Sequence, residues 1–408
     1  MGNTDMNPEQ QRHQLPLPND TDRVFLSLLV LQGSPFCNID CDYCYLPNRN
    51  VTRRMSMEVL EKTIARVCED ELIGHAFDIL WHAGEPLAVP VDYYEKAIEV
   101  IRRFPQADEH AKFVFQTNAM LIDQKWCDFF KLHDVNLGVS IDGPQFLHDA
   151  HRKTRKGEGT HAQVVAGIEK LHENELSFGV IAVISETSLD FPDDIFYFLL
   201  ELGCFNVGFN IEEIEGANRE TSLSVDGSEH RLHRFLRRFF ELNRQHKFPL
   251  QVREFDDARE RILNPQTYIN NEPQPFSMIN VDCDGNFSTF SPELLGQATE
   301  EYGSFQFGNV LENRFFDATS NKAFQKILRD IEAGNKKCAE SCYYFPFCQG
   351  ASPTNKYFEN KTFDSSETMH CRSVIQIPVD IVRRDIYLHG QWPQRDFENR
   401  QQTAMIPE

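Results

Sequence analysis

Short apolar runs alternate with segments of helical periodicity over the first half of the chain. The apolar runs, each with the loop that follows it, lie at residues 24–32, 77–86, 112–120, 135–144, 177–186 and 205–213, and they predict six β-strands. Five helices are predicted between them, at residues 56–72 (with Ser56 as N-cap), 91–104, 123–133, 160–174 and 192–203. Strict alternation of strand and helix predicts a parallel sheet with helical crossovers.

Six such repeats favour an α/β fold with a partial (β/α)6 TIM-like barrel, in which the loops after the strands build the site. The alternative is an open doubly wound sheet, but no glycine-rich phosphate fingerprint follows the first strand. A hairpin that turns at Asp284-Gly285 begins a second pattern. We expect a disordered N-terminal tail at 1–23, the barrel at 24–216, a helical bridge at 217–275, a second domain at 276–375 and a C-terminal tail at 376–408.

Acidic residues outnumber basic ones along the chain. Lys and Arg total 41, Asp and Glu total 62, and the formal net charge is −21. Such a surface repels phosphate backbones and anionic headgroups, which argues against nucleic acid and membranes as partners. No apolar stretch is long enough to span a bilayer, and the polar N-terminus contains no signal-peptide core. The sequence therefore predicts a cytoplasmic protein with a neutral, cationic or peptide partner.

Each notable polar motif directly follows a predicted strand. The motifs are a cysteine-rich loop after the first strand, HAGEP (82–86) after the second, QTN (116–118) after the third, SIDGP (140–144) after the fourth and NIEEIEG (210–216) after the sixth. The carboxyl ends of parallel strands meet at one edge of a sheet, and in barrels this edge carries the active site. The sequence therefore predicts an active site there.

The cysteine-rich loop contains Cys37, Cys41 and Cys44, and no fourth cysteine follows nearby. In a reducing compartment such thiols are free to bind metal. A structural zinc ion is usually closed by four protein ligands. A four-iron cluster held by three cysteines instead leaves one iron open to a ligand from outside the protein.

With the motifs after strands two to four, this loop resembles the radical S-adenosylmethionine (SAM) superfamily. The resemblance implies a partial barrel whose three cysteines hold a four-iron, four-sulfur cluster, and SAM as the ligand of the open iron. It also implies that SAM is cleaved to a 5′-deoxyadenosyl radical, which abstracts a substrate hydrogen. The residues that it places at the cofactor are Tyr43, Gly84, Glu85, Asn118, Ser140, Asp142 and Arg152. Ala83 and Ala119 stand where this superfamily usually has glycine.

A second cysteine group consists of Cys338, Cys342, Cys348 and Cys371. Four thiolates can close a zinc site or hold a fully ligated iron–sulfur cluster, and the spacing alone slightly favours zinc. Behind a radical SAM barrel, the group resembles the SPASM extension, which holds auxiliary four-iron clusters. Phe290 and Ser352 stand where that extension usually has two further cysteines. The resemblance therefore implies one auxiliary cluster and leaves Cys283 as a buried thiol or an unusual ligand.

The motifs also resemble the SPASM peptide maturases of glycine-rich-repeat ribosomal precursors. That family forms cyclophanes, in which an aromatic ring is joined to the β-carbon of a nearby residue. The resemblance implies a ribosomal, glycine-rich precursor peptide as partner and an external one-electron reductant. The candidate proton acceptors are Glu212, Glu213 and Glu215, although each is also readable as part of a solvated acidic loop. Residues 1–23 are too few for a leader-binding domain, so we expect leader recognition elsewhere.

Three alternatives stay open. A sulfatase-type maturase, which oxidises Cys or Ser to formylglycine, shares the scaffold, but the two missing cysteines count against it. The acidic charge disfavours an RNA-modifying radical enzyme. Outside enzymes, the alternative is a non-catalytic zinc or iron–sulfur protein.

Overall fold

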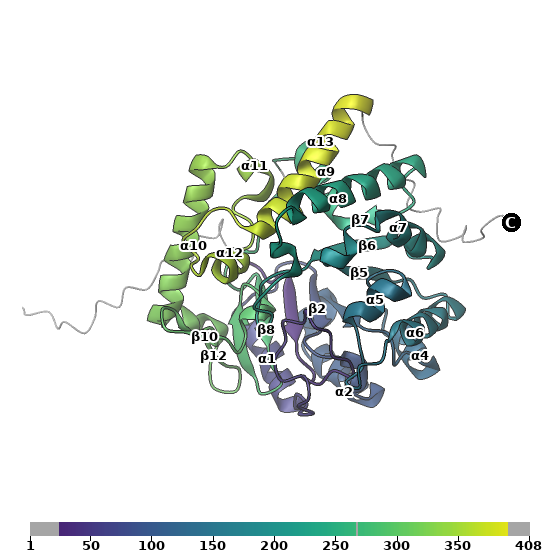
Figure 1. The fold of residues 1–408 in the computed structure, drawn as a ribbon. Helices are drawn as coiled ribbons and strands as arrows, with labels where there is room; N and C mark the ends of the chain where they lie inside the picture. Colours follow the sequence, from purple (N-terminus) through teal and green to yellow (C-terminus); the bar gives the residue numbers. More distant parts are fainter. Residues whose placement is uncertain (1–23, 267, 391–408) are drawn as a thin grey trace, which may run out of the picture.

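The computed structural model describes residues 24–266 and 268–390 of the 408-residue chain. The expected N-terminal tail therefore lies outside the described residues. Most strands form one ten-stranded sheet, in the order β12-β9-β8-β1-β2-β3-β4-β5-β6-β7 (Figure 1). The six predicted strands are β1 (Leu28–Leu31), β2 (Phe77–Trp81), β3 (Ala111–Thr117), β4 (Asn136–Ser140), β5 (Gly179–Ile184) and β6 (Asn206–Ile211). They are parallel and adjacent in sequence order, as predicted.

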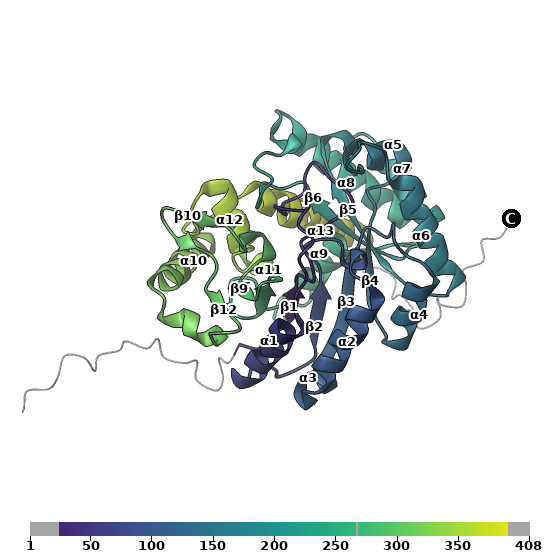
Figure 2. The ribbon, with the colours of Figure 1, turned by 90° about the horizontal axis from the view of Figure 1, so that it is seen from below.

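Helices cover the outer face of this curved sheet, as Figure 2 shows. They are α1 (Met57–Glu69), α2 (Val91–Arg102), α3 (Pro105–His110), α4 (Gln124–Leu132), α5 (Gln145–His151), α6 (His161–Glu173) and α7 (Pro192–Glu201). Helix α1 begins where predicted, because the Ser56 side chain accepts a hydrogen bond from the Val59 amide and satisfies a free N–H. Its buried face then packs into the core under the sheet.

Alternation along the strands separates the two faces of the sheet. Leu31 of β1 pairs with Trp81 of β2, and Trp81 packs edge-on against Tyr94 of α2 with ring centroids 5.0 Å apart. These residues therefore face the helices. Successive side chains of a strand point to opposite faces, so Val30 and Gln32 face the barrel lumen.

The expected bridge contributes to the sheet as well as to the helices. It contains α8 (Ser228–Gln245), α9 (Arg253–Leu263) and the two-residue strand β7 (Gln251–Val252). Strand β7 pairs in parallel with β6 and adds to the parallel sheet a strand that the sequence does not predict. A two-residue strand carries too little apolar periodicity to be found from sequence.

The C-terminal region joins the barrel through its own hairpin. Strands β8 (Met278–Val281) and β9 (Asn286–Thr289) are antiparallel, and the chain turns at Asp284-Gly285 as predicted. Strand β8 also pairs in parallel with β1, which extends the barrel sheet into the second region. The remaining elements are β10 (Ala298–Thr299), β11 (Gly303–Ser304), β12 (Gly308–Asn309), α10 (Lys322–Ser341), α11 (Phe345–Cys348), α12 (Pro353–Asn360) and the π-helical η7 (Cys371–Gln376).

The segment expected to be a C-terminal tail begins instead with a packed helix. Helix α13 (Ile377–His389) lies against α9, with Val379, Ile381 and Val382 buried. The spacing of these apolar residues is helical, so the sequence carried this signal. Among the described residues, no helix combines the length and apolarity needed to cross a bilayer.

Candidate active site at the carboxyl end of the barrel

The three-cysteine loop lies directly after β1. Its two limbs are tied together by a hydrogen bond from the Cys37 amide to the Arg49 carbonyl, 3.0 Å long. Burial, together with the nearby Glu85 carboxylate, raises the pKa of the Cys37 thiol to about 12, and burial raises that of Cys41 to about 11. Such thiols ionise only beside strong positive charge. Sulfur donors of this kind fit a cationic metal centre, which deprotonates its thiol ligands.

The HAGEP loop packs against the backbone of the cysteine loop. Gly84 has a φ of +144°, and a Cβ added there would lie 2.1 Å from the Ser34 carbonyl oxygen. The amide of Glu85 donates to the Phe36 carbonyl at 2.7 Å. Only glycine allows this approach, so the two loops are held as one unit.

The Glu85 carboxylate fastens the second loop to the third. It is 2% exposed and accepts hydrogen bonds from the Leu87 amide, the Thr117 hydroxyl and the Asn118 amide at 2.7–2.9 Å. Burial raises the pKa of this carboxyl to about 7. The Asn118 side chain in turn donates to the Asn38 side chain at 2.7 Å, inside the cysteine loop. The structure thus brings these predicted residues together and gives Glu85 a bracing role.

A buried ion pair fastens the fourth strand to the cysteine loop. Arg152 donates from Nε and Nη2 to the two carboxylate oxygens of Asp142, each at 2.9 Å. The Tyr43 hydroxyl donates to the same carboxylate at 2.5 Å, and the guanidinium lies 5.5 Å from the Tyr43 ring centre. Burial by itself would raise the pKa of Asp142, but the neighbouring Arg152 guanidinium keeps this pKa below its usual value. Ser140 stands apart from this cluster and accepts a hydrogen bond from Gln116 at 2.8 Å.

The second cysteine group is contributed by three helices. Cys338 is in α10, Cys342 follows that helix, Cys348 ends α11 and Cys371 begins η7. Burial, together with the three other thiols, raises the pKa of Cys348 to about 11. In the described part of the chain, no three His, Cys, Asp or Glu side chains converge as the ligands of a single ion would. Four thiolates can close a zinc site or hold an iron–sulfur cluster.

Phe290 and Ser352, which stand where the SPASM extension usually has cysteines, each make a structural contact. Phe290 is 2% exposed and stacks on Phe324 with ring centroids 6.3 Å apart. The Ser352 side chain caps α12 by accepting from the Asn355 amide. Cys283, the remaining thiol of interest, is 5% exposed at the hairpin turn.

The loop after β6 contains the three candidate proton acceptors. Glu212 accepts hydrogen bonds from the amide and hydroxyl of Ser222. Glu213 forms an ion pair with His370 at 2.9 Å. Burial raises the pKa of Glu215 well above its usual value, and the neighbouring carboxyl of Glu293 raises it further.

Sequence reasoning missed Glu293 and His370. Glu293 belongs to the one-turn helix η5 (Pro292–Leu294), and burial raises its pKa to about 8. His370 directly precedes Cys371, a candidate metal ligand. This position next to Cys371 was the one signal in the sequence that could have pointed to His370. Both residues meet the loop after β6 only through the tertiary fold.

Three comparisons place this site among known proteins. The family model of the radical SAM superfamily matches residues 31–198. An uncharacterized protein of Synechocystis is 41% identical over 361 residues, which cover 87% of this chain and 91% of that protein. A cysteine-type anaerobic sulfatase-maturating enzyme of Clostridium perfringens is 30% identical over 351 residues, covering 80% and 88%.

A solved structure, anSMEcpe with bound AdoMet and Cp18Cys peptide, has the same fold. Its TM-score is 0.74 at 20% identity, and the match covers 89% of this chain and 98% of that one. AdoMet is SAM. The predicted α/β fold with its parallel sheet thus agrees with both the sequence and the fold comparisons. The chain belongs to the radical SAM superfamily, the enzymes that bind a four-iron, four-sulfur cluster and SAM, and anaerobic sulfatase-maturating enzymes are among its relatives.

Proposed function

We propose that this chain is a peptide maturase that joins an aromatic side chain to the β-carbon of a nearby residue in a ribosomally made, glycine-rich precursor. Its relatives support a polypeptide substrate, because sulfatase maturases modify proteins and a structural neighbour is described with a peptide. The resemblance of the strand-end motifs to cyclophane-forming maturases supports the crosslink.

One observation carries the proposal: the loop after β6 lies between the two cysteine groups. Glu213 pairs with His370, the residue before Cys371. On the other side, the Ala217 amide donates to the Tyr45 carbonyl at 2.7 Å, one residue after Cys44. A substrate bound at this loop would therefore lie between a site of hydrogen abstraction and a second redox site.

The first cysteine group and the loops after β2–β4 would hold the cluster and SAM. Tyr43, Asp142 and Arg152 fix one wall of this site, Gly84, Glu85 and Asn118 fix another, and Ser140 lies at the end of β4. Bound there, the cofactors supply hydrogen-atom abstraction from an unactivated carbon. The second group, Cys338, Cys342, Cys348 and Cys371, would hold one auxiliary four-iron cluster. The structural uses of Phe290 and Ser352 support one such cluster rather than two.

Crosslinking removes two hydrogens from the peptide. The 5′-deoxyadenosyl radical would take one as an atom from the β-carbon, and the carbon radical would then bond to the ring. The ring would lose the other hydrogen as a proton to a carboxylate and one electron to the auxiliary cluster, which restores aromaticity. Of the three candidate bases, Glu212 and Glu213 are already engaged by Ser222 and His370. Glu215 faces another carboxyl instead, and its raised pKa suits a group that takes up a proton.

The proposed function is tested by co-expression with glycine-rich candidate precursors, taken first from any short reading frames beside the gene. Mass spectrometry should show a loss of two hydrogens per crosslink, and fragmentation should place the bond between a ring and a β-carbon. The Cys44→Ala variant is the control and should leave the peptide unchanged. An unchanged mass with the parent enzyme, in the presence of SAM cleavage, would refute crosslinking.

The role of Glu215 is tested with Glu215→Gln. This change keeps the shape but removes the proton acceptor, so we expect crosslinking to slow by about 100-fold, the typical contribution of a general base. SAM cleavage should continue near the parent rate. Equal slowing in Glu212→Gln, whose carboxylate is engaged by Ser222, would contradict the assignment.

The relatives favour a second candidate, sulfatase maturation. This reaction would convert Cys or Ser of a sulfatase peptide to formylglycine. An aldehyde-reactive hydrazide should label the product if this candidate is right. We expect no labelling of a sulfatase peptide that contains Cys or of one that contains Ser.

A further inference from the structure

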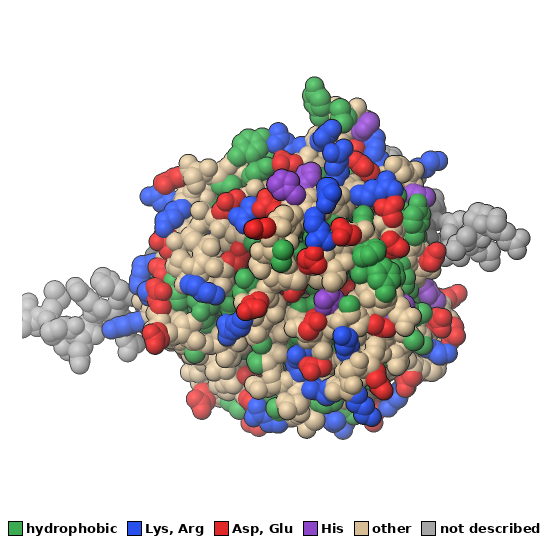
Figure 3. All heavy atoms as spheres, viewed as in Figure 1, with side chains coloured by type: hydrophobic (Ala, Val, Ile, Leu, Met, Phe, Trp, Pro, Cys, Tyr) green, Lys and Arg blue, Asp and Glu red, His purple; other side chains and the backbone are tan. Residues whose placement is uncertain are grey.

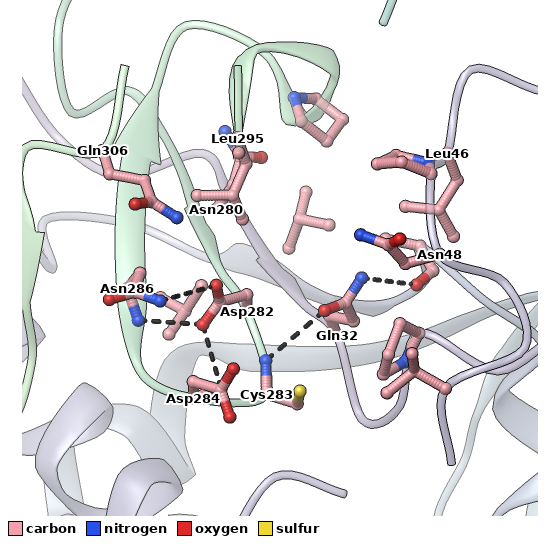
Figure 4. Close-up of a pocket in the computed structure, with 18 of the residues that line it drawn as sticks. Gln32, Leu46, Asn48, Asn280, Asp282, Cys283, Asp284, Asn286, Leu295 and Gln306 are labelled. Carbon is pink, nitrogen blue, oxygen red and sulfur yellow. Dashed lines mark hydrogen bonds between the residues drawn. The ribbon is translucent and has the colours of Figure 1, made fainter. Parts of the chain in front are cut away.

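A cavity of about 260 Å³ opens at the lumen side of β1 and β8 (Figure 4). Three segments line it: the end of β1 with Val30 and Gln32, the stretch 46–51 that follows the three cysteines, and the hairpin β8–β9 with η5. In Figure 4, Leu46 and Asn48 lie across from the hairpin residues. The cavity therefore adjoins the cysteine loop on the side of the C-terminal region.

The cavity does not coincide with the wall assigned to SAM. The residues expected at that cofactor lie in the cysteine loop and in the loops after β2, β3 and β4, and none of them lines the cavity. The HAGEP loop contributes only Ala83. A ligand in the cavity would therefore be next to the cofactor and separate from it.

One buried amide in the lining has an oxygen without a hydrogen-bond partner among the described residues. Asn280 is 1% exposed, and its Nδ2 donates to the Ser288 hydroxyl at 3.2 Å. Its Oδ1 has no hydrogen-bond partner among the described residues. Turning the amide over would only exchange the two ends, so one polar end stays unpaired. Buried polar groups are nearly always paired, which points to a ligand that supplies the missing partner.

The charged groups in the lining are already satisfied. The Asp282 carboxylate accepts hydrogen bonds from the amide of Asp284 and from the amide and side chain of Asn286, each at 2.9 Å. Arg53 pairs with Asp284 at 2.9 Å. The rest of the lining mixes apolar side chains, such as Leu46 and Leu295, with uncharged amides, such as Asn48 and Gln306. This lining suits an uncharged ligand with an apolar side chain and a hydrogen-bonding backbone.

We propose that this cavity is a substrate subsite that holds one or two uncharged residues of the peptide beside the reacting residue. The proposal rests on the proposed function only in taking the substrate to be a peptide. A peptide group offers both a donor and an acceptor to Asn280. The volume lies just below the range of pockets that enclose a whole small ligand, which suits a short part of a longer chain.

The test uses the reconstituted enzyme, titrated anaerobically with acetyl-Gly-Phe-Gly-amide and with the Lys and Glu counterparts. We expect the Phe peptide to bind at least tenfold more tightly than the charged ones. Leu295→Trp fills the cavity and should weaken the binding of the Phe peptide at least tenfold. Leu311→Trp is the matched control, because Leu311 is 41% exposed and does not line the cavity.

Asn280→Leu keeps the test decisive if Leu295→Trp fails to fold. The variant loses the hydrogen bond to Ser288 but also removes the unpaired oxygen, so Tm should change little while peptide binding weakens about tenfold. A lower Tm with unchanged binding would mean a merely structural amide. No binding of the Phe peptide by the parent, or parent-like binding in both variants, overturns the subsite.

SAM cleavage without peptide is measured for every variant and separates the two proposals. Absence of cleavage in the parent would refute the proposed function. Normal cleavage with unchanged peptide affinity in both variants would refute the subsite alone.

Discussion

At the scale of single residues, the site uses its charged side chains mainly to hold other residues. Asp142 and Arg152 neutralise each other in a buried pair, and Glu85 accepts three hydrogen bonds that fasten two loops. Breaking such buried pairs is costly because one charge is left without a partner. The sequence identifies these residues by motif, but their partners are set by the fold.

The pair of Glu213 and His370 makes a pH-dependent contribution to stability. Burial would lower the pKa of His370, but Glu213 raises it to about 9, and His370 holds the pKa of Glu213 below normal. The stabilisation is therefore fully present below the ordinary histidine pKa and is lost as pH rises through 9. At the acid end, it is lost as the carboxylate protonates.

We expect Glu213→Gln to destabilise the protein by about 3 kcal/mol at pH 6.5 and by much less at pH 10. Anaerobic thermal melts at both pH values measure this as a change in Tm. Glu229→Gln is the control, because Glu229 pairs with Arg372 in an exposed pair, which contributes less than about 1 kcal/mol. An equal loss at both pH values would contradict the ion-pair explanation.

At the scale of elements, the active end is one unit made from four loops. Each loop follows a parallel strand, and each is bonded to the cysteine loop or to its neighbour. The sequence order of the strands predicted this meeting point. It did not predict that Gly84 is pressed against the Ser34 carbonyl, because such contact depends on the path of both backbones.

We expect Gly84→Ala to lower stability by about 1–3 kcal/mol and to reduce iron bound at the first cysteine group. The added Cβ would both strain the backbone and collide with the cysteine loop. Gly157→Ala is the matched control, since Gly157 also has positive φ but nothing lies within 4 Å of its Cβ position. Iron loss in both variants would mean that backbone strain alone is responsible.

At the scale of the whole molecule, the two cysteine groups belong to one continuous structure. Strand β8 of the C-terminal region pairs with β1, and α13 packs on α9. Figure 3 shows acidic and basic side chains interspersed over one face, so the net charge of −21 is not gathered into a single patch there. On the described surface in this view, no patch of a single charge would attract a charged partner to one place.

We expect the anaerobically reconstituted parent to contain about eight irons per chain and Cys342→Ala about four. Elemental analysis and absorption spectra measure this, with Cys127→Ala as the control, because Cys127 is a fully buried core thiol. About four irons plus one zinc in the parent would refute the auxiliary cluster.

The sequence by itself determined the strand order, the end of the sheet that carries the site and the three-thiol loop, because these depend on local periodicity and short spacings. Only the tertiary structure decided which carboxyls are paired. It also brought Glu293 beside Glu215, made β8 the neighbour of β1 and opened the cavity beside Asn280. These features join segments far apart in the chain, so their energies depend on burial and contacts that no local pattern records.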